Sequence, residues 1–200
     1  PNTKMILIEG ISNPTLRVAD FHGISSICKE AGIILAVDNT FTTPKAFQPL
    51  KHGADIVIHS VTKLLAGHSD VTLGYVVAKD AALNKRIYDF AVTTGLTASP
   101  FDCWLAERGL LTFDLRFEKA QKNAENLADA LATHPKIARV LYPMRKDHPD
   151  HELAKKHFKG NGCNMVSFEL TNKTRAAANL FTQCLEGIAS APTLGDVGTT

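Results

Sequence analysis

The feature that most constrains the fold is a short apolar run that recurs along the first third of the sequence. Such runs cover residues 4–9, 33–37 and 55–58, and residues 21–31 between the first two carry apolar side chains at helical spacing. Short continuous apolar runs are typical of strands that are buried on both faces of a parallel sheet. Because strand–helix–strand units join parallel strands by right-handed crossovers, the sequence predicts an α/β fold with a mostly parallel sheet.

Local signals mark where the elements around these strands begin and end. Asp20 can cap a helix that Gly32 ends, and residues 43–53 are long enough for a crossover that contains a short helix. A further strand is predicted at residues 74–78. The connection that reaches it from Lys63 is too short for a helical crossover, so this strand is expected to run antiparallel.

The rest of the sequence is predicted to be helical at first and then to alternate strands and helices. The expected elements are helices at 83–90, 99–111 and about 115–132, a strand at 137–142, a charged loop at 144–159, a strand at 165–170, a helix at 174–185 and a strand at 188–191. The final strand–helix–strand unit is expected to form a separate small α+β domain. The predicted domain boundary lies at the start of the long helix, between residues 1–113 and 114–200.

Composition excludes several classes of protein. Of the 200 residues, 44% are hydrophobic and 21% are charged, values typical of a globular protein with a core. A net charge of +2 without a basic stripe predicts no nucleic-acid partner, and the absence of a long apolar run predicts no membrane partner. Four widely spaced cysteines without a Cys-x-x-Cys pair indicate reduced core thiols of a cytoplasmic protein. No signal peptide opens the chain, whose abrupt start suggests that it begins inside something larger.

The residues that follow the third strand change character at once. Ser60, Thr62 and Lys63 come just past its carboxyl end, and Gly67 follows in a turn. In an open α/β sheet this edge is where ligands bind. The two hydroxyls could donate to phosphate oxygens, and a lysine held against an apolar strand suits Schiff-base chemistry. Taken alone, a Ser-x-Thr-Lys segment is more often an ordinary solvated surface segment.

The whole stretch from Asp55 to Ser69 resembles the cofactor-lysine signature of the pyridoxal-phosphate (PLP) enzymes of cysteine and methionine metabolism, the cystathionine γ-synthase, cystathionine γ-lyase and methionine γ-lyase family. That signature runs D-hydrophobic-x-x-x-S-x-T-K-aromatic-x-x-G-H-S, and this sequence keeps every position except the aromatic one, which is Leu64. The resemblance implies a PLP-dependent transferase of fold type I, with helices on both faces of the sheet and a smaller α+β C-terminal domain. Residues 1–113 would be the later part of its PLP-binding domain, and residues 114–200 the linking helix and first part of the C-terminal domain.

Two further motifs precede this stretch. Residues 37–41 resemble the family's D-N-T-[FW], which implies that Asp38 holds the PLP ring nitrogen protonated, as an electron sink requires. On its own, a carboxylate at this point is equally compatible with a loop residue or a helix cap. Residues 9–14 resemble E-S-P-x-N-P, which implies that Asn13 hydrogen-bonds the cofactor's phenolic oxygen and lies near the substrate. A plain Asn-Pro β-turn is equally compatible with that segment.

A fourth motif lies near the end of the sequence. Residues 191–196 resemble the family's S-L-G-[GD] element with Thr193 in place of serine, which keeps a hydroxyl near the substrate carboxylate and Lys63. Pro192 stands where enzymes that grip the distal amine of cystathionine often carry glutamate. Because proline cannot make that contact, this position does not support specificity for cystathionine.

The resemblance implies a PLP-dependent trans-sulfuration enzyme of the cystathionine γ-lyase or γ-synthase type. It would catalyse γ- or β-elimination or γ-replacement on small-molecule substrates, namely sulfur amino acids or O-acylhomoserine. Lys63 would carry the cofactor and then move protons, while Ser60 and Thr62 would bind the cofactor's phosphate. The resemblance also implies a homotetramer whose sites are shared between subunits.

Other interpretations of the sequence stay open. Within the family, the motifs are compatible with a methionine γ-lyase or an O-acetylhomoserine sulfhydrylase, and outside it with a non-catalytic α/β assembly module that keeps the fold. His148, His151 and His157 suggest a metal site, but their segment resembles the family's H-P-x-H-E-x-A connector, so no metal is expected. His59 and His68 are expected to pack or to hydrogen-bond near the cofactor.

Overall fold

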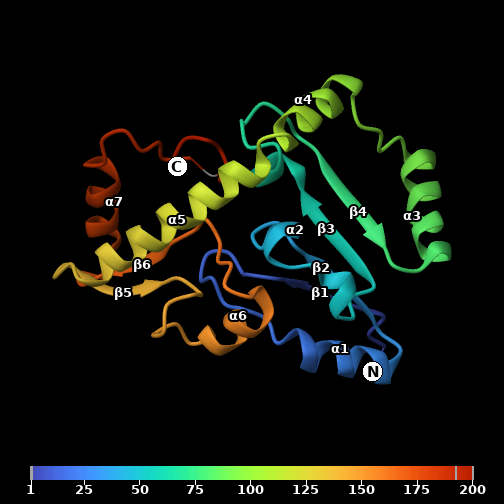
Figure 1. Ribbon diagram of the computed structural model, residues 1–200, viewed down its shortest axis with the longest axis horizontal. Coiled ribbons are helices and arrows are strands. Elements are labelled where there is room, and N and C mark those ends of the chain that lie inside the picture. Colours follow the sequence, from blue (N-terminus) through green and yellow to red (C-terminus); the bar gives the residue numbers. More distant parts are fainter. Residues whose placement is uncertain (1, 192, 200) are drawn as a thin grey trace.

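The computed structural model describes residues 2–191 and 193–199, which contain a four-stranded sheet, a two-stranded sheet and the helices around them (Figure 1). The elements are, in order, β1 (Met5–Glu9), α1 (Phe21–Ala31), β2 (Ile34–Asp38), α2 (Thr43–Ala46), η1 (Pro49–His52), β3 (Ile56–Ser60), η2 (Val61–Leu65), β4 (Gly74–Ala78), α3 (Ala81–Thr94), α4 (Pro100–Leu110), α5 (Phe113–Ala132), β5 (Ile137–Leu141), α6 (His151–Phe158), β6 (Ser167–Leu170) and α7 (Arg175–Gln183). Pro192, which bears on the predicted specificity for cystathionine, lies outside the described residues.

The main sheet has the strand order β1-β2-β3-β4. The first three strands run parallel, with Glu9 opposite Asp38 and Asp38 opposite Ile58. The fourth strand pairs with β3 in the antiparallel direction. The sequence predicts both the mostly parallel sheet and the reversed fourth strand, and the structure confirms both. Because the three parallel strands are in register, their carboxyl ends meet at one edge of the sheet.

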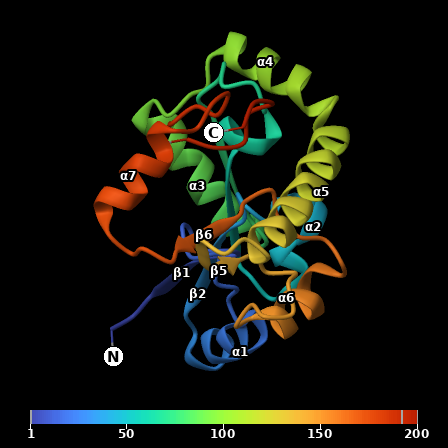
Figure 2. The same ribbon diagram turned by 90° about the vertical axis from the view of Figure 1, so that its left-hand side faces the viewer.

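Helices cover both faces of the sheet because side chains alternate between its faces along each strand. On one face, Ala36 and Ile56 pack with Leu83 of α3. On the other face, Leu35 and Val37 belong to a larger core that includes residues of α1, α5 and α6. In both ribbon views α1 lies below β1 and β2 (Figures 1 and 2). The predicted arrangement of helices on both faces is therefore present.

The first helix begins and ends where the sequence predicts. Asp20 accepts a hydrogen bond from the backbone N–H of Gly23, which satisfies one of the free donors of the first turn. Gly32 ends the helix with a φ of 63°, a left-handed conformation that favours glycine. The chain then enters β2 almost at once, so α1 and the two strands around it form the first crossover of the sheet.

Two predictions for the second half of the chain are wrong. The segment 144–159, expected to be a charged loop, contains α6, because Ala154, His157 and Phe158 form a buried stripe at helical spacing among the charges. The strand expected at residues 188–191 does not form. These residues are exposed and pair with no strand in the part of the chain that the structure describes. They lead instead toward the carboxyl edge of the main sheet.

The long helix α5 has 20 residues and connects α4 to the two-stranded sheet of β5 and β6 (Figure 1). It begins at the predicted domain boundary. Its residue Ala128 belongs to the same hydrophobic core as Val37 of β2 and Tyr142, which follows β5. The division into two domains stays a prediction, because one continuous core contains residues from both sides of the boundary. Within residues 2–191 and 193–199, no helix is both long and apolar enough to cross a membrane.

The four cysteines are free thiols. Cys28 and Cys163 are buried, as the sequence predicts for core residues, whereas Cys103 and Cys184 are exposed. Burial raises the pKa of Cys163 to about 12, so this thiol stays protonated at neutral pH. The expectation of core thiols is therefore right for two of the four cysteines and wrong for the other two.

Candidate functional site

A cavity of about 440 Å³ lies at the carboxyl edge of the parallel strands. Its lining brings together residues from the loop after β1, the end of β2, the end of β3 and the segment that follows α7. Five of the predicted site residues are among them: Asn13, Asp38, Ser60, Lys63 and Thr193. The cavity therefore gathers, from four distant parts of the sequence, most of the residues that the motifs indicate.

Lys63 lies in the single π-helical turn η2, which follows β3 directly. The turn is closed by a hydrogen bond from the N–H of Ala66 to the carbonyl of Val61, 2.9 Å long. Within it, Lys63 has a non-helical backbone, with φ −87° and ψ −126°. Its amine Nζ donates a hydrogen bond to Thr193 Oγ1 at 2.8 Å. The Lys63 amine is thus held at a break in the helical turn, at the wall of the cavity.

The segment that carries Thr193 lies directly against the lysine turn. At Gly195, where φ is 87°, an added Cβ atom would come within 2.7 Å of the backbone nitrogen of Leu64. The N–H of Val197 donates to the carbonyl of Gly67 at 3.0 Å. A glycine is needed at position 195 because the two backbones approach too closely for any side chain. This close approach places the Thr193 hydroxyl at the lysine amine.

Asp38 is the last residue of β2, and its carboxylate accepts a hydrogen bond from the N–H of Thr40 at 2.9 Å. Its register partner on β1, Glu9, also lines the cavity. Glu9 Oε2 accepts a hydrogen bond from the N–H of Asn13 at 3.1 Å, which fixes the loop that carries the asparagine. In the sequence, Glu9 is only the first position of the 9–14 motif. Its place at the end of a parallel strand, the same as that of Asp38, was the signal for a second carboxylate in the site.

The two predicted phosphate ligands differ in position. Ser60 lines the cavity, and its N–H donates to Thr40 Oγ1 at 3.0 Å. Thr62 is not among the lining residues, and its hydroxyl donates to the carbonyl of Leu73 at 3.1 Å and accepts from the N–H of the same residue at 2.9 Å. Thr62 therefore anchors η2 to the segment that enters β4. A role for either hydroxyl in phosphate binding stays a prediction.

The lining residues fit a pyridoxal phosphate by the chemistry of their side chains. Such a group needs an amine for its aldehyde, a carboxylate for its ring nitrogen and donors for its phosphate. Lys63, Asp38 and Ser60 supply one of each around a single cavity. The arrangement could hold the cofactor between the end of β2 and the lysine turn.

The histidines near the site do not line the cavity. His59 is buried to 1% exposure and stacks on Tyr75, with ring centroids 5.6 Å apart. Burial lowers its pKa, although the nearby charge of Asp38 opposes this shift. His68 Nδ1 lies 2.7 Å from the carbonyl of Ala66. Both histidines therefore pack or hydrogen-bond beside the site, as the sequence predicts.

The histidines of the 144–159 segment take part in packing. His148 and His157 are buried, and burial lowers the pKa of each. In the described parts of the chain, no group of three or more His, Cys, Asp or Glu side chains is placed to hold a metal ion. These imidazoles belong to the core around α6.

Comparison with known proteins gives the same assignment from a separate direction. The model of the family described as "Cys/Met metabolism PLP-dependent enzyme" matches residues 1–200. A crystal structure of cystathionine γ-synthase from Xanthomonas oryzae pv. oryzae, in complex with aminoacrylate and cysteine, is 43% identical with a TM-score of 0.93. The alignment covers 98% of this chain and 50% of that one. The predicted PLP-dependent fold class is confirmed for the residues that the two chains share.

Curated relatives of similar identity catalyse different reactions. Cystathionine γ-lyase of Bacillus subtilis (strain 168) is 44% identical over 180 residues, which are 90% of this chain and 47% of that protein. Cystathionine β-lyase MetC of the same organism is 44% identical over 173 residues, which are 86% of this chain and 44% of that protein. The chain thus spans about half the length of the curated relatives it matches. By the match over all its residues, the chain belongs to the Cys/Met metabolism PLP-dependent enzyme family.

Proposed function

We propose that this chain forms the lysine-bearing part of the active site of a PLP-dependent trans-sulfuration enzyme. The enzyme catalyses γ- or β-elimination or γ-replacement on sulfur amino acids or O-acylhomoserine. The observation that supports this most is the cavity at the carboxyl edge of the sheet, where the Lys63 amine and the Asp38 carboxylate line the same space. Two such groups on one cavity are what the cofactor requires at its aldehyde and at its ring nitrogen.

Each residue of the chain has a distinct part in this proposal. When bound, PLP supplies an electron sink that makes the α-carbon of an amino acid acidic. Lys63 Nζ would hold the cofactor and would also accept the proton that leaves the substrate α-carbon. Asp38 holds the proton on the ring nitrogen. The Ser60 hydroxyl donates to the phosphate, and the Thr62 hydroxyl does so once it turns away from the carbonyl of Leu73.

Two further residues orient the reactants. The Asn13 amide hydrogen-bonds the phenolic oxygen of the cofactor and faces the substrate, and its loop is fixed by the hydrogen bond from its backbone to Glu9. Thr193 Oγ1 accepts from Lys63 Nζ and so directs the amine toward the cavity. The same hydroxyl meets the substrate carboxylate in this proposal.

The first experiment tests the covalent attachment. Purified full-length protein loaded with PLP should be yellow, and borohydride should fix the cofactor on Lys63, as peptide mass spectrometry would show. Lys45→Ala is the matched control, because Lys45 pairs with Asp114 and Glu118 and does not line the cavity. After borohydride treatment it should still carry the cofactor on Lys63, whereas Lys63→Ala should carry no fixed cofactor. A colourless wild-type protein would favour the non-catalytic assembly module instead.

The second experiment identifies the reaction. The protein is offered cystathionine, methionine, cysteine and O-acylhomoserine, each with and without a thiol acceptor. γ-Elimination of cystathionine gives cysteine, 2-oxobutyrate and ammonia, whereas β-elimination gives homocysteine, pyruvate and ammonia. Consumption of a thiol with O-acylhomoserine indicates γ-replacement, and release of methanethiol from methionine indicates a methionine γ-lyase. Absence of 2-oxobutyrate from every γ-substituted substrate would exclude γ-elimination.

We also propose a cytoplasmic homotetramer whose sites are shared between subunits. Four free thiols support the compartment, and large exposed apolar side chains on α3 and α4, among them Phe90, Phe101 and Trp104, support an interface. Sedimentation equilibrium of the full-length protein should give four times the mass of one chain. A monomer that retains full activity would contradict shared sites.

A further inference from the structure

Arg116, in the first turns of α5, makes four hydrogen bonds around the turn that carries Lys63. Its Nη1 donates to the carbonyl of Leu64 at 2.8 Å, and its Nη2 donates to the carbonyls of Leu65 at 2.9 Å and Gly109 at 2.8 Å. Its Nε donates to Thr112 Oγ1 at 3.0 Å. One planar guanidinium thus joins η2, the end of α4 and the start of α5.

This cation is partly buried, and no carboxylate of the described residues forms an ion pair with it. Burial lowers the pKa of Arg116, and no acidic side chain of the described residues counteracts that shift. A partly buried charge is stabilised only if its donors are satisfied, and here three of the four acceptors are backbone carbonyls. Removing a cation from water costs free energy, so we infer that the hydrogen bonds from Arg116 to η2 have a structural role.

The carbonyls that Arg116 binds need such a partner. The last carbonyls of a helix find no N–H donor within that helix, and η2 is only one turn long. Leu64 and Leu65 follow Lys63 directly, so the two charge-assisted bonds fix the backbone immediately after the reactive lysine. At Gly67, an added Cβ atom would clash with the guanidinium, which shows how closely the chain is folded around it.

The lysine turn is therefore held from two sides. On one side, the Arg116 guanidinium binds the carbonyls of Leu64 and Leu65. On the other, the segment from Thr193 to Val197 contacts the lysine amine and the carbonyl of Gly67. Lys63 sits between these contacts with a backbone that departs from helical geometry.

We propose that Arg116 is a positioning residue that sets the orientation of Lys63 toward the cavity through the carbonyls of η2. This inference rests on the proposed function, in which Lys63 carries the cofactor. Arg116 does not line the cavity, so its effect passes through the backbone of the turn. A lysine at this position keeps the charge but lacks the planar fork that reaches three carbonyls at once.

The test compares Arg116→Lys with Arg145→Lys in the full-length protein. Arg145 is the matched control, because its side chain is also partly buried but pairs with Asp129 and Asp147, away from the cavity. The measurement is the rate at which apoprotein and PLP form the borohydride-reducible adduct on Lys63, followed across a range of pH. The thermal midpoint of each variant is recorded beside it.

Arg116→Lys should slow adduct formation by about ten- to a hundredfold, since small displacements of a reacting group have effects of that size. It should also shift the pH profile of the reaction. Arg145→Lys should leave the rate and the profile at the wild-type values, even if both variants lose a similar amount of thermal stability. Equal rates for the two variants would overturn the role of Arg116 and leave the proposed function intact.

Two further outcomes would also decide the role of Arg116. If Arg116→Lys does not fold, Thr112→Val removes only the hydroxyl that receives Arg116 Nε, and it should shift the rate in the same direction by a smaller factor. A folded Thr112→Val protein with the wild-type rate would then overturn the proposal. If wild-type protein forms no adduct on Lys63, the proposed function fails and this inference fails with it.

Discussion

Two regions of the molecule bury polar side chains among apolar ones, and they do so in opposite ways. At the carboxyl edge of the sheet, Asp38 and Lys63 line a cavity of about 440 Å³. Between α1, η1 and α6, the buried His157 is enclosed by aromatic rings, with its centroid 5.1 Å from that of Phe21 and 5.8 Å from that of Phe47. The comparison teaches that a buried polar group indicates a binding site where open space faces it, and a packing role where rings enclose it.

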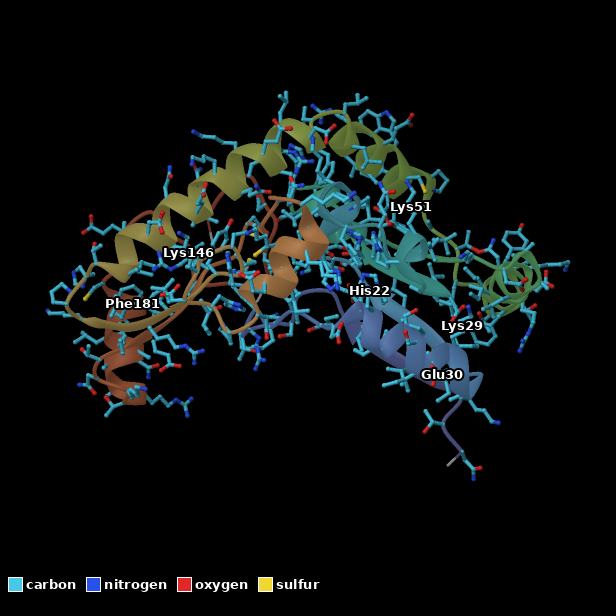
Figure 3. The ribbon with its side chains drawn as sticks, turned by 60° about the horizontal axis from the view of Figure 1, so that its bottom comes forward. His22, Lys29, Glu30, Lys51, Lys146 and Phe181 are labelled. Atoms are coloured by element: carbon cyan, nitrogen blue, oxygen red, sulfur yellow. The ribbon has the colours of Figure 1, made fainter. Side chains whose placement is uncertain are left out.

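The histidine cluster shows how the packing region keeps its polar groups uncharged. His22 of α1 lies beside α6 in Figure 3, with its ring centroid 5.4 Å from that of His157. Burial lowers the pKa of His157, and the neighbouring side chains of His22 and Lys156 lower it further. The imidazole is therefore neutral near pH 7. In the cavity, by contrast, the proposed chemistry needs an amine that accepts a proton and a carboxylate that stays charged.

The largest expected effect is on activity, in the cavity. Lys63→Ala removes the only amine among the described residues that line the cavity, so turnover should fall by at least about a thousandfold. Product assays and absorbance of the bound cofactor would measure the loss. The thermal midpoint should stay close to that of the wild type, because the Lys63 side chain adds little to the core. If Lys63→Ala lost much stability and kept its activity, the cavity would resemble the packing region and the contrast between the two would disappear.

The next effect is on stability, in the aromatic region. Phe158 is fully buried, so Phe158→Ala should lower the free energy of unfolding by about 3–5 kcal/mol. Chemical denaturation would measure it. The specific activity of the folded fraction should be unchanged, because Phe158 does not line the cavity. If Phe158→Ala also lowered the activity of each folded molecule, the two regions would be coupled.

A smaller effect on activity is expected at Asp38. Asp38→Asn keeps the shape of the side chain and its hydrogen bond from Thr40 but removes the charge that we propose for the ring nitrogen. Turnover should fall by about a hundredfold, the usual cost of losing one electrostatic partner of a reacting group. Asp20→Asn is a suitable control, since Asp20 caps α1 and lies outside the cavity lining. Unchanged turnover in Asp38→Asn would refute the assignment of the carboxylate.

The smallest effect is on pH dependence, in the histidine cluster. The folded chain lowers the pKa of His157, so the unfolded chain binds the proton more readily. The free energy of unfolding should therefore fall as pH drops below about 6.5, the ordinary pKa of histidine. His157→Gln should flatten this dependence in urea titrations at several pH values. The exposed His134→Gln should leave it as it is, and an unaltered slope in His157→Gln would contradict the prediction.

The packing of the tail shows where sequence patterns fail. The charged segment around His151 folds as α6, because Ala154 and Phe158 share a buried face that the high charge content obscured. The apolar run at 188–191 forms no strand, since a strand needs a neighbouring edge that local composition does not supply. Both errors come from contacts made far away in the sequence.

The sequence by itself determined the parallel sheet and the residues at its carboxyl edge. Strand ends are local signals, so the positions of Asp38, Ser60 and Lys63 could be predicted from apolar runs and the polar residues that follow them. The motif at 191–196 indicated a hydroxyl near the lysine, and the structure confirms this contact between Lys63 and Thr193. These predictions succeed because each depends on a short pattern with a definite geometry.

Only the tertiary structure decided which neighbours hold those residues in place. The Arg116 guanidinium binds backbone carbonyls, which every residue possesses, so no pattern of side chains could reveal its partners. Likewise, the carboxylate of Glu9 is the second one at the cavity, because the parallel register aligns Glu9 with Asp38. Local sequence specifies which groups can react, and long-range packing specifies where they point. The reason is that backbone carbonyls are the same in every residue, so the sequence does not indicate which of them will accept a hydrogen bond.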